Sequence, residues 1–583
     1  CILTLFQNIN HPEDLKKLEP SELTLLCSEI RTFFIDRILK NGGHFSANLG
    51  VVELTVALHF IFNFKEDKLV WDVGHQAYIH KLLTGRKHSF DSIRKFGGIS
   101  GFPNIDESPF DHFGTGHSST SISAVVGMAE AALLDGKDRN HIAVIGDGSL
   151  SGGMAFEALN NLGDSNANVL VIVNDNQIGI DPNSGALGDH LNDITKTASN
   201  IFTHLNIAYS GPIDGHSTKD LIEALEDLKS NKGPKVLHIK TLKGKGYKPA
   251  EEEQTDWHSV SYVKINPAKK ETREVKPLKF QDVFGHTLVE LAKLDKRVVG
   301  ITPAMPSGSS MKFLMDELPE RVFDVGIAEQ HAVTFAAGLA LEGKRPFCNI
   351  YSSFAQRAFD QIIHDVALQN IPVIFCLDRA GLVGADGPTH HGVFDLAFLN
   401  AIPNLVIMSP MDEHELRDAM YFAKDYVEGP IVIRYPRGRG SKRNYHSSIK
   451  NVEIAKSRAL TKGTSIAIFS IGQIGTEVQK AIAENDLTNA ATHIDARFMK
   501  PLDLNEIGET FRSFSRIITI EEGCLKGGFG ESIKVLAHDS NYKGTITALG
   551  LPDNFIEHGE IDELREKYGL DAQSISKIIS TLV

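Results

Sequence analysis

Oxygen-bearing side chains follow two strand-like runs in the first third of the chain. Asp147 closes the apolar run 141–148, and Asn176 closes the run 168–176. Because the carboxyl ends of adjacent parallel strands meet at one rim of a sheet, we expect both side chains on the same rim. Magnesium prefers hard oxygen ligands in an octahedron and usually keeps positions for phosphate oxygens and water. The spacing therefore predicts a magnesium site with Asp147, Asn176 and the carbonyl of Ile178 as ligands, holding a diphosphate.

Other small and polar residues are placed to add donors for that diphosphate. A GDG sequence alone indicates only a tight turn, but here a strand precedes it and NDN follows. The segment GTGHSST opens a helix of small residues, whose free N–H groups would attract phosphate; an ordinary Ser/Thr-capped helix is the alternative. A lysine after the run 234–241 adds positive charge, unless it lies in a solvated loop. The residues expected to bind the diphosphate end are Gly116, His117, Ser118, Gly148, Ser149 and Lys243.

Six longer stretches carry a resemblance that spans nearly the whole chain. They are WDVGHQAYIHKLLTGR (71–86), GHSSTSISA (116–124), GDGSLSGGMAFEALN (146–160), DVGIAEQHAVTFAAGLA (324–340), DRAGLVGADGPTHHGVFDL (378–396) and RYPRG (434–438). With these stretches the chain resembles the 1-deoxy-D-xylulose-5-phosphate synthases, a family of transketolase-like enzymes that use thiamine diphosphate and Mg²⁺. The resemblance implies decarboxylation of pyruvate and ligation to D-glyceraldehyde 3-phosphate, a step that feeds isoprenoid, thiamine and pyridoxal biosynthesis. It also implies a homodimer.

The resemblance assigns an activating acid to the second part of the chain. Glu329 lies near the start of a helix of small residues. A glutamate in a first helical turn commonly does no more than complement the helix dipole. A carboxylic acid in an apolar site can instead give a proton to a ring nitrogen, and the resemblance implies that Glu329 does so to the cofactor's pyrimidine. Tyr351 and Phe354 are then expected to line the pyrimidine pocket.

Histidines in the first part of the chain are candidates for proton transfer. His44 lies in a glycine-flanked loop and His75 follows the strand-like LVWDV. Histidine is the side chain best suited to exchange protons near neutral pH, although each could be a hydrogen-bonded structural histidine. The resemblance implies that both line the pyruvate end of the site, with His75 also contacting the cofactor, and that His258 joins them.

Two arginines are candidates for binding the acceptor's phosphate. Arg379 and Arg437 each follow a strand-like run, and guanidinium groups bind phosphate bidentately. The alternative for Arg437 is a plain surface charge. The resemblance implies that both arginines grip the phosphate of glyceraldehyde 3-phosphate, that Asp386 and His390 act at its hydroxyl or aldehyde end, and that Tyr351 also contacts substrate.

The elements needed to position these residues form three α/β patterns in succession. Short β-branched runs alternate with longer helical patterns, which is typical of parallel sheets covered by helices. We expect three consecutive doubly wound, transketolase-like α/β domains with mostly parallel sheets. These are a diphosphate-binding domain at 1–275, a pyrimidine-binding domain at 276–442 and a C-terminal domain at 443–583, with a charged, irregular linker at about 252–280.

Composition narrows the partners and the compartment. The 583 residues carry a formal charge of −14 and no dense Lys/Arg run, which disfavours nucleic acid as the main partner. Five scattered cysteines indicate reduced thiols, and no apolar stretch is long enough for a membrane helix. We expect a protein of the bacterial cytoplasm; a removed transit peptide would place it in the plastid stroma instead.

The pattern departs from the family at one segment, and three alternatives compete. The stretch 185–214 is shorter than the family's usual mobile segment. A shorter segment calls closure over the site into question, but it does not affect the prediction of cofactor binding. A transketolase would carry Glu-Gly where this chain has Gly152-Gly153. A 2-oxoacid dehydrogenase subunit would have no use for two phosphate-binding arginines. A non-catalytic relative would be expected to lose Glu329, Asp147 or Asn176, and all three are present.

Overall fold

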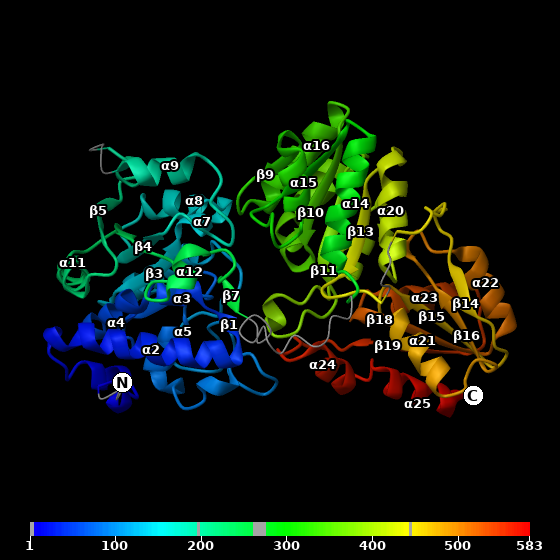
Figure 1. Ribbon diagram of the computed structural model, residues 1–583, viewed down its shortest axis with the longest axis horizontal. Helices are drawn as coiled ribbons and strands as arrows, with labels where there is room; N and C mark the ends of the chain where they lie inside the picture. Colours follow the sequence, from blue (N-terminus) through cyan, green and yellow to red (C-terminus); the bar gives the residue numbers. More distant parts are fainter. Residues whose placement is uncertain (1–4, 195–198, 261–275, 442–445) are drawn as a thin grey trace. The chain divides into compact units, whose positions relative to one another are not determined.

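The chain folds into two compact units, each built on parallel sheets (Figure 1). The computed structural model describes residues 5–194, 199–260, 276–441 and 446–583. Described residues up to 260 belong to the first unit, and those from 276 onward, apart from 326–328, to the second. No helix among the described residues is long and apolar enough to cross a bilayer.

The first unit is a doubly wound sheet. Its five strands run in parallel in the order β2-β3-β4-β6-β5. Alternate strand residues face opposite layers: Ile142 and Ile172 pack with one set of helices, whereas Ala143 and Val171 pack with the other. The strands are β2 (Lys68–Trp71), β3 (His141–Gly146), β4 (Val169–Asp175), β5 (Ala208–Asp214) and β6 (Lys235–Lys240). The helices of the two layers are α2 (Leu23–Asn41), α4 (Val52–Ile61) and α11 (Thr218–Ser230) on one face, and α6 (Ser121–Leu134) and α8 (Gly153–Leu162) on the other.

Residues 252–260, the first part of the expected linker, belong to the first unit. Strand β7 (Ser259–Val260) pairs antiparallel with β1 (Gly43–His44), and Trp257 packs against Phe45 and Tyr247. The charged sequence EEEQTD obscured this return of the chain to its own unit. Residues 261–275, which make up most of the expected linker, lie outside the described residues, as do residues 195–198 of the short segment; the rest of that segment forms α9 (Ala186–Asp193), α10 (Ile201–His204) and β5.

The second unit contains two sheets. The first has the order β17-β12-β13-β11-β10-β8-β9 and is parallel except for β17; the second has the order β14-β16-β15-β18-β19 and is parallel except for β14. The strands are β8 (Val298–Thr302), β9 (Val322–Asp324), β10 (Arg345–Tyr351), β11 (Ile374–Ala380), β12 (Val406–Met408), β13 (Ile431–Pro436), β14 (Arg458–Thr461), β15 (Ile466–Ile471), β16 (Ala491–Asp495), β17 (Phe498–Lys500), β18 (Arg516–Cys524) and β19 (Thr545–Leu551). The longer helices are α14 (Phe280–Leu294), α16 (Glu329–Leu341), α20 (Glu413–Asp425), α21 (Gly475–Glu484), α22 (Leu504–Ser513), α23 (Phe529–Asp539) and α25 (Ala572–Leu582).

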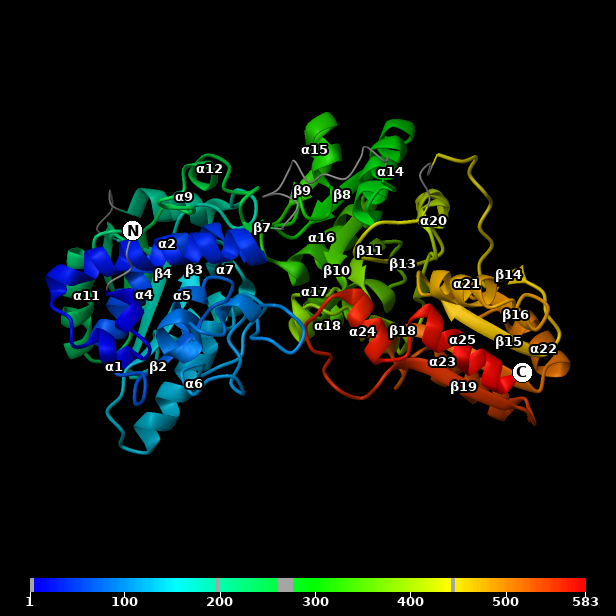
Figure 2. The same ribbon diagram turned by 60° about the horizontal axis from the view of Figure 1, so that its bottom comes forward.

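The two sheets of the second unit are connected by a strand and by a common hydrophobic core. Strand β17 comes from the C-terminal third of the chain yet pairs with β12 of the first sheet, and one hydrophobic cluster contains both Phe375 and Phe469. Figure 2 labels β8 to β11 and β13 of the first sheet, and β14, β15, β16, β18 and β19 of the second. The predicted α/β class with mostly parallel sheets is confirmed. The division into separate domains near residue 443 stays a prediction.

Candidate active site

Asp147 and Asn176 come together at the rim of the first sheet. Strands β3 and β4 are parallel neighbours, with Gly146 paired to Asn174. Asp147 is the first residue of the short helix α7 (Asp147–Leu150), and its Oδ2 accepts the N–H of Asn176 at 3.1 Å. The Asn176 Oδ1 in turn accepts the N–H of Ile178 at 3.2 Å. The carboxylate of Asp147 and the amide oxygen of Asn176 therefore lie close together at the rim.

This rim suits a divalent cation. Burial, and then the negative charge of Asp175, raise the pKa of Asp147 to about 6. A bound cation would favour the ionised carboxylate and so offset both the burial and the repulsion from Asp175. Among the described residues, no group of three or more His, Cys, Asp or Glu side chains forms a metal cluster. One carboxylate with neutral oxygens is the donor set that magnesium takes when phosphate completes its shell.

Lys243 brings a buried positive charge to the same rim. It is 2% exposed, so the solvated-loop alternative is wrong. Its Nζ donates to the carbonyl of Gly179 and lies 3.3 Å from His258 Nδ1. Burial lowers the pKa of Lys243 to about 8, against the opposing charges of Asp147 and Asp181. A buried ammonium beside the acidic rim is suited to an anionic ligand.

Two backbone N–H groups at the start of helix α6 are already bound within the chain. The Asp72 carboxylate accepts the N–H groups of Ser119 at 2.8 Å and Ser121 at 3.1 Å. Burial raises the pKa of Asp72, and these hydrogen bonds oppose that shift. The sequence did contain a signal that we missed, because Asp72 follows β2 just as Asp147 follows β3. Binding of the cofactor by Gly116, His117 and Ser118, which precede this point, stays a prediction.

The three candidate histidines form one cluster in the first unit. The ring centroids of His44, His75 and His258 are 5.5 to 6.0 Å apart. Burial, and then the charge of Lys243, lower the pKa of His75 to about 3, so its imidazole is neutral. Its buried Nδ1 has no hydrogen-bond partner among the described residues. His44 is held by its Nδ1, 3.2 Å from the Tyr78 hydroxyl. An unsatisfied buried ring nitrogen is the kind of group that a ligand completes.

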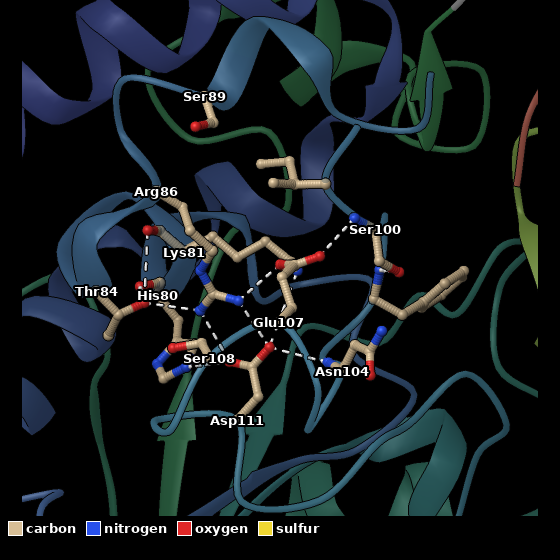
Figure 3. A network of polar contacts seen from close by, with 12 residues as sticks. His80, Lys81, Thr84, Arg86, Ser89, Ser100, Asn104, Glu107, Ser108 and Asp111 are labelled. Atoms are coloured by element: carbon tan, nitrogen blue, oxygen red, sulfur yellow. Dashed lines mark hydrogen bonds and ion pairs between the residues drawn. The ribbon is translucent and has the colours of Figure 1, made fainter. Parts of the chain in front are cut away.

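A buried charge network lies in the same unit and consists of Lys81, Arg86, Glu107 and Asp111 (Figure 3). Arg86 donates to both Asp111 oxygens, at 2.7 and 2.8 Å, and His80 Nε2 lies 3.0 Å from Oδ1. Burial alone would raise the pKa of Asp111, but Arg86 and His80 hold it well below its usual value. The charges of two cations and two anions thus neutralise one another in the interior of the unit.

The network holds a loop against the histidine cluster. Glu107 accepts the N–H of Ser100 at 2.7 Å, and Asp111 accepts that of Asn104 at 2.9 Å. Between these two anchors lies Phe102, whose ring is 5.4 Å from that of His44. The loop therefore forms one wall of the histidine cluster.

Replacing Asp111 with asparagine should lower the free energy of unfolding of the first unit by about 3–5 kcal/mol, because it leaves buried cations without their counter-charge. Both tryptophans of the chain, Trp71 and Trp257, lie in this unit, so urea unfolding followed by tryptophan fluorescence reports on it selectively. Asp36→Asn, at an exposed ion pair with Lys40, serves as the control and should change nothing measurable. Equal stability of both variants would contradict this account of the network.

Glu329 is a buried acid in the second unit. It is the first residue of helix α16 and is 6% exposed. Burial raises the pKa of its carboxyl, and the charge of Arg357 opposes the shift. A carboxyl with a raised pKa retains its proton closer to neutral pH and can share it with a ring nitrogen. This environment fits the activating acid that the resemblance implies.

Aromatic rings gather near the end of β10. Tyr351 and Phe354 stack with centroids 5.5 Å apart, and His390 meets the Phe354 ring edge-on at 5.5 Å. The buried Oγ atoms of Ser352 and Ser353 have no partner among the described residues. Stacked rings beside unsatisfied hydroxyls suit a planar ligand with polar edges. The two serines were not expected, because nothing in the sequence distinguishes them from a helix cap.

The two candidate arginines also lie in this unit, beside Asp386. The Arg379 guanidinium lies 4.2 Å from the Tyr351 ring centroid. Arg437 donates to the carbonyl of Val383 at 2.6 Å and lies 3.3 Å from Asp386. The Arg437 side chain is 41% exposed, which leaves it accessible to a ligand. Tyr351, Phe354, Arg379, Asp386, His390 and Arg437 thus form one group, separate in the chain from the rim of the first unit.

Three family models match the chain in succession. Residues 6–199 and 194–241 match 1-deoxy-D-xylulose-5-phosphate synthase, residues 276–442 the transketolase pyrimidine-binding domain, and residues 455–575 the transketolase C-terminal domain. The 1-deoxy-D-xylulose-5-phosphate synthase of Cytophaga hutchinsonii is 49% identical, with 99% of this chain and 98% of that protein covered. The protein of the same name from Bacteroides thetaiotaomicron is 48% identical, with 99% and 96% covered.

The chain belongs to the 1-deoxy-D-xylulose-5-phosphate synthase family. It is therefore a transferase of the transketolase type in a family that uses thiamine diphosphate. Transketolase from Leishmania mexicana is 17% identical over 97% of both chains, with a TM-score of 0.45, which is too low to bear on the site.

Membership of the 1-deoxy-D-xylulose-5-phosphate synthase family separates this chain from transketolase itself. The N-terminal match covers Asp147, Asn176, His44 and His75, and it is to the synthase family. The match to the transketolase pyrimidine-binding domain covers Glu329 and both arginines, and the match to the transketolase C-terminal domain follows it. The synthases of that name match nearly the whole chain, the second unit included.

Proposed function

We propose that this chain is the 1-deoxy-D-xylulose-5-phosphate synthase of its organism. It would decarboxylate pyruvate and join the remaining two-carbon unit to D-glyceraldehyde 3-phosphate, releasing carbon dioxide and 1-deoxy-D-xylulose 5-phosphate. The observation that carries the proposal is 46–49% identity to several proteins of that name over 98–99% of this chain. The product would supply isoprenoid, thiamine and pyridoxal biosynthesis.

The rim of the first unit would hold the diphosphate end of the cofactor. Asp147, Asn176 and the Ile178 carbonyl would bind Mg²⁺, and Lys243 would neutralise the diphosphate. The cofactor, once bound, supplies the nucleophilic carbon and the electron sink for decarboxylation. The chain's further contacts to it would come from Gly116, His117, Ser118, Gly148, Ser149 and His75.

The remaining residues would handle protons and substrate. Glu329 would hold a proton against the pyrimidine ring nitrogen, with Tyr351 and Phe354 packing beside that ring. The imidazoles of His44, His75 and His258 would hydrogen bond to pyruvate, since their cluster combines burial with an unsatisfied nitrogen.

The acceptor would bind in the second unit, at the group of residues around Tyr351 and Arg379. Arg379 and Arg437 would bind its phosphate, and Asp386 and His390 would contact its hydroxyl or aldehyde oxygen. Two guanidinium groups suit a terminal phosphoryl group because each presents paired donors.

We also propose a homodimer acting in the bacterial cytoplasm, with the plastid stroma as the alternative compartment. Support comes from the family and from its bacterial members at 46–49% identity. Sedimentation of the purified chain would test the oligomeric state.

Carbon dioxide release should require pyruvate, glyceraldehyde 3-phosphate, thiamine diphosphate and Mg²⁺ together. Trapping labelled carbon dioxide from [1-¹⁴C]pyruvate measures this, with each component omitted in turn. Product identity is checked by mass spectrometry. Consumption of a ketose phosphate donor without pyruvate would favour transketolase and overturn the proposal.

A further inference from the structure

Strand β11 contains an extra residue at the point where the candidate acceptor site begins. Leu377 pairs with Arg434 of β13, but the next pair is Ala380 with Pro436, so three steps on β11 match two on β13 (the strands are labelled in Figure 1). One extra residue in one strand is a β-bulge, a feature that re-aims side chains and is frequent beside active sites. Arg379, within the bulge, has a φ of 62°. A left-handed conformation is uncommon for a residue with a Cβ.

The bulge lets two neighbouring side chains meet. In a regular strand, consecutive residues point to opposite faces. Here the Asp378 Oδ1 accepts the backbone N–H of Arg379 at 2.7 Å, and Oδ2 forms an ion pair with Arg379 Nη1. The carboxylate thus holds the backbone and the guanidinium of the same residue.

The Arg379 guanidinium is held in place, but not all of its N–H groups are hydrogen bonded. Its carbon lies 4.2 Å from the Tyr351 ring centroid, and the Arg379 side chain is 14% exposed. Across the described ranges, Nε and Nη2 of Arg379 make no hydrogen bond to protein. Those nitrogens remain as donors for a ligand, held in one orientation by the Asp378 carboxylate and the Tyr351 ring.

The buried ion pair of Asp378 with Arg379 is expected to add little to the stability of the fold. The Asp378 side chain is fully buried, and burial raises its pKa to about 6 despite the opposing charge of Arg379. A buried ion pair commonly contributes little net stability, because desolvation offsets the attraction. Its value here lies in orientation, since a pre-oriented guanidinium loses less freedom when it binds a phosphate.

We propose that Asp378, acting through the bulge, is a positioning residue that sets the enzyme's preference for a phosphorylated acceptor. This inference rests on the proposed function, in which Arg379 binds the phosphate of glyceraldehyde 3-phosphate. Asp378 itself contacts no substrate in this scheme. Its carboxylate determines where the Arg379 donors point.

The test compares phosphorylated and unphosphorylated acceptors in Asp378→Asn. With glyceraldehyde 3-phosphate, we expect KM to rise by about 10- to 100-fold, the range for losing a charge-assisted hydrogen bond. With D-glyceraldehyde, and for the KM of pyruvate, we expect changes of less than about threefold. In an Arg379→Ala background, Asp378→Asn should add almost nothing, because both changes remove the same interaction.

Asp495→Asn is the matched control. Asp495 is also fully buried in the second unit and pairs with Arg458, but it lies outside the candidate site, so the acceptor preference should be unchanged. If Asp378→Asn does not fold, Asp378→Glu keeps the charge and displaces it by one methylene, and a phosphate-specific loss is again expected.

Two outcomes would overturn the inference: equal losses with both acceptors in a variant that folds, or an unchanged preference for the phosphorylated acceptor. Failure of the wild-type chain to use glyceraldehyde 3-phosphate would instead refute the proposed function.

Discussion

Replacing Glu329 with glutamine should lower the rate of carbon dioxide release from pyruvate by about 10²- to 10⁴-fold, the usual contribution of a positioned acid or base. The amide has nearly the shape of the neutral acid but cannot give up and retake a proton. Burial raises the pKa of Glu329, and the amide adds no charge to this buried position. We therefore expect the variant to fold and to bind thiamine diphosphate within about tenfold of wild type. The measurement is single-turnover release of labelled carbon dioxide with saturating cofactor.

Glu342→Gln provides the matched control for this experiment. Glu342 follows the other end of helix α16 and is exposed, so the same chemical change there should leave turnover unaffected. A Glu329→Gln variant that turns over as fast as wild type would remove the proposed role of the acid. A variant that binds no cofactor would point to a structural role instead.

The sequence was sufficient wherever position on a strand determined position in space. Asp147 and Asn176 were expected at one rim because each ends a parallel strand, and the structure joins them by a hydrogen bond. The alternation of apolar runs with helical patterns likewise predicted the α/β class. Both inferences needed only local periodicity and the geometry of parallel sheets.

Contacts between distant or irregular segments were not predictable in this way. Asp72 accepts the N–H of Ser121 at the start of α6, although the two residues are 49 positions apart. His258 lies beside His44 because β7 pairs with β1, a pairing of two-residue strands with no pattern of their own. The bulge at Asp378 depends on how β11 meets β13. The roles assigned to individual site residues remain predictions, because geometry shows which groups meet but not what they bind.

The second large effect is expected at the metal rim. Asp147→Asn should weaken thiamine diphosphate binding by at least about 100-fold in the presence of Mg²⁺, since even residues that only support metal ligands cost 10- to 100-fold when changed. The variant keeps the size of the side chain and removes its charge. Isothermal titration calorimetry of the cofactor with and without Mg²⁺ measures the effect directly.

The dependence on magnesium makes this prediction specific to a metal ligand. In wild type, a chelator should weaken cofactor binding strongly, because a cation held by Asp147 would neutralise the diphosphate. In Asp147→Asn the chelator should change little, because the proposed cation site would already be lost, so the two perturbations should not add. Asp164→Asn, an exposed carboxylate just beyond α8, should behave as wild type in both conditions. If Asp147→Asn binds the cofactor tightly and still responds to chelation, the cation is held by other residues, and the rim of β3 and β4 is not its site.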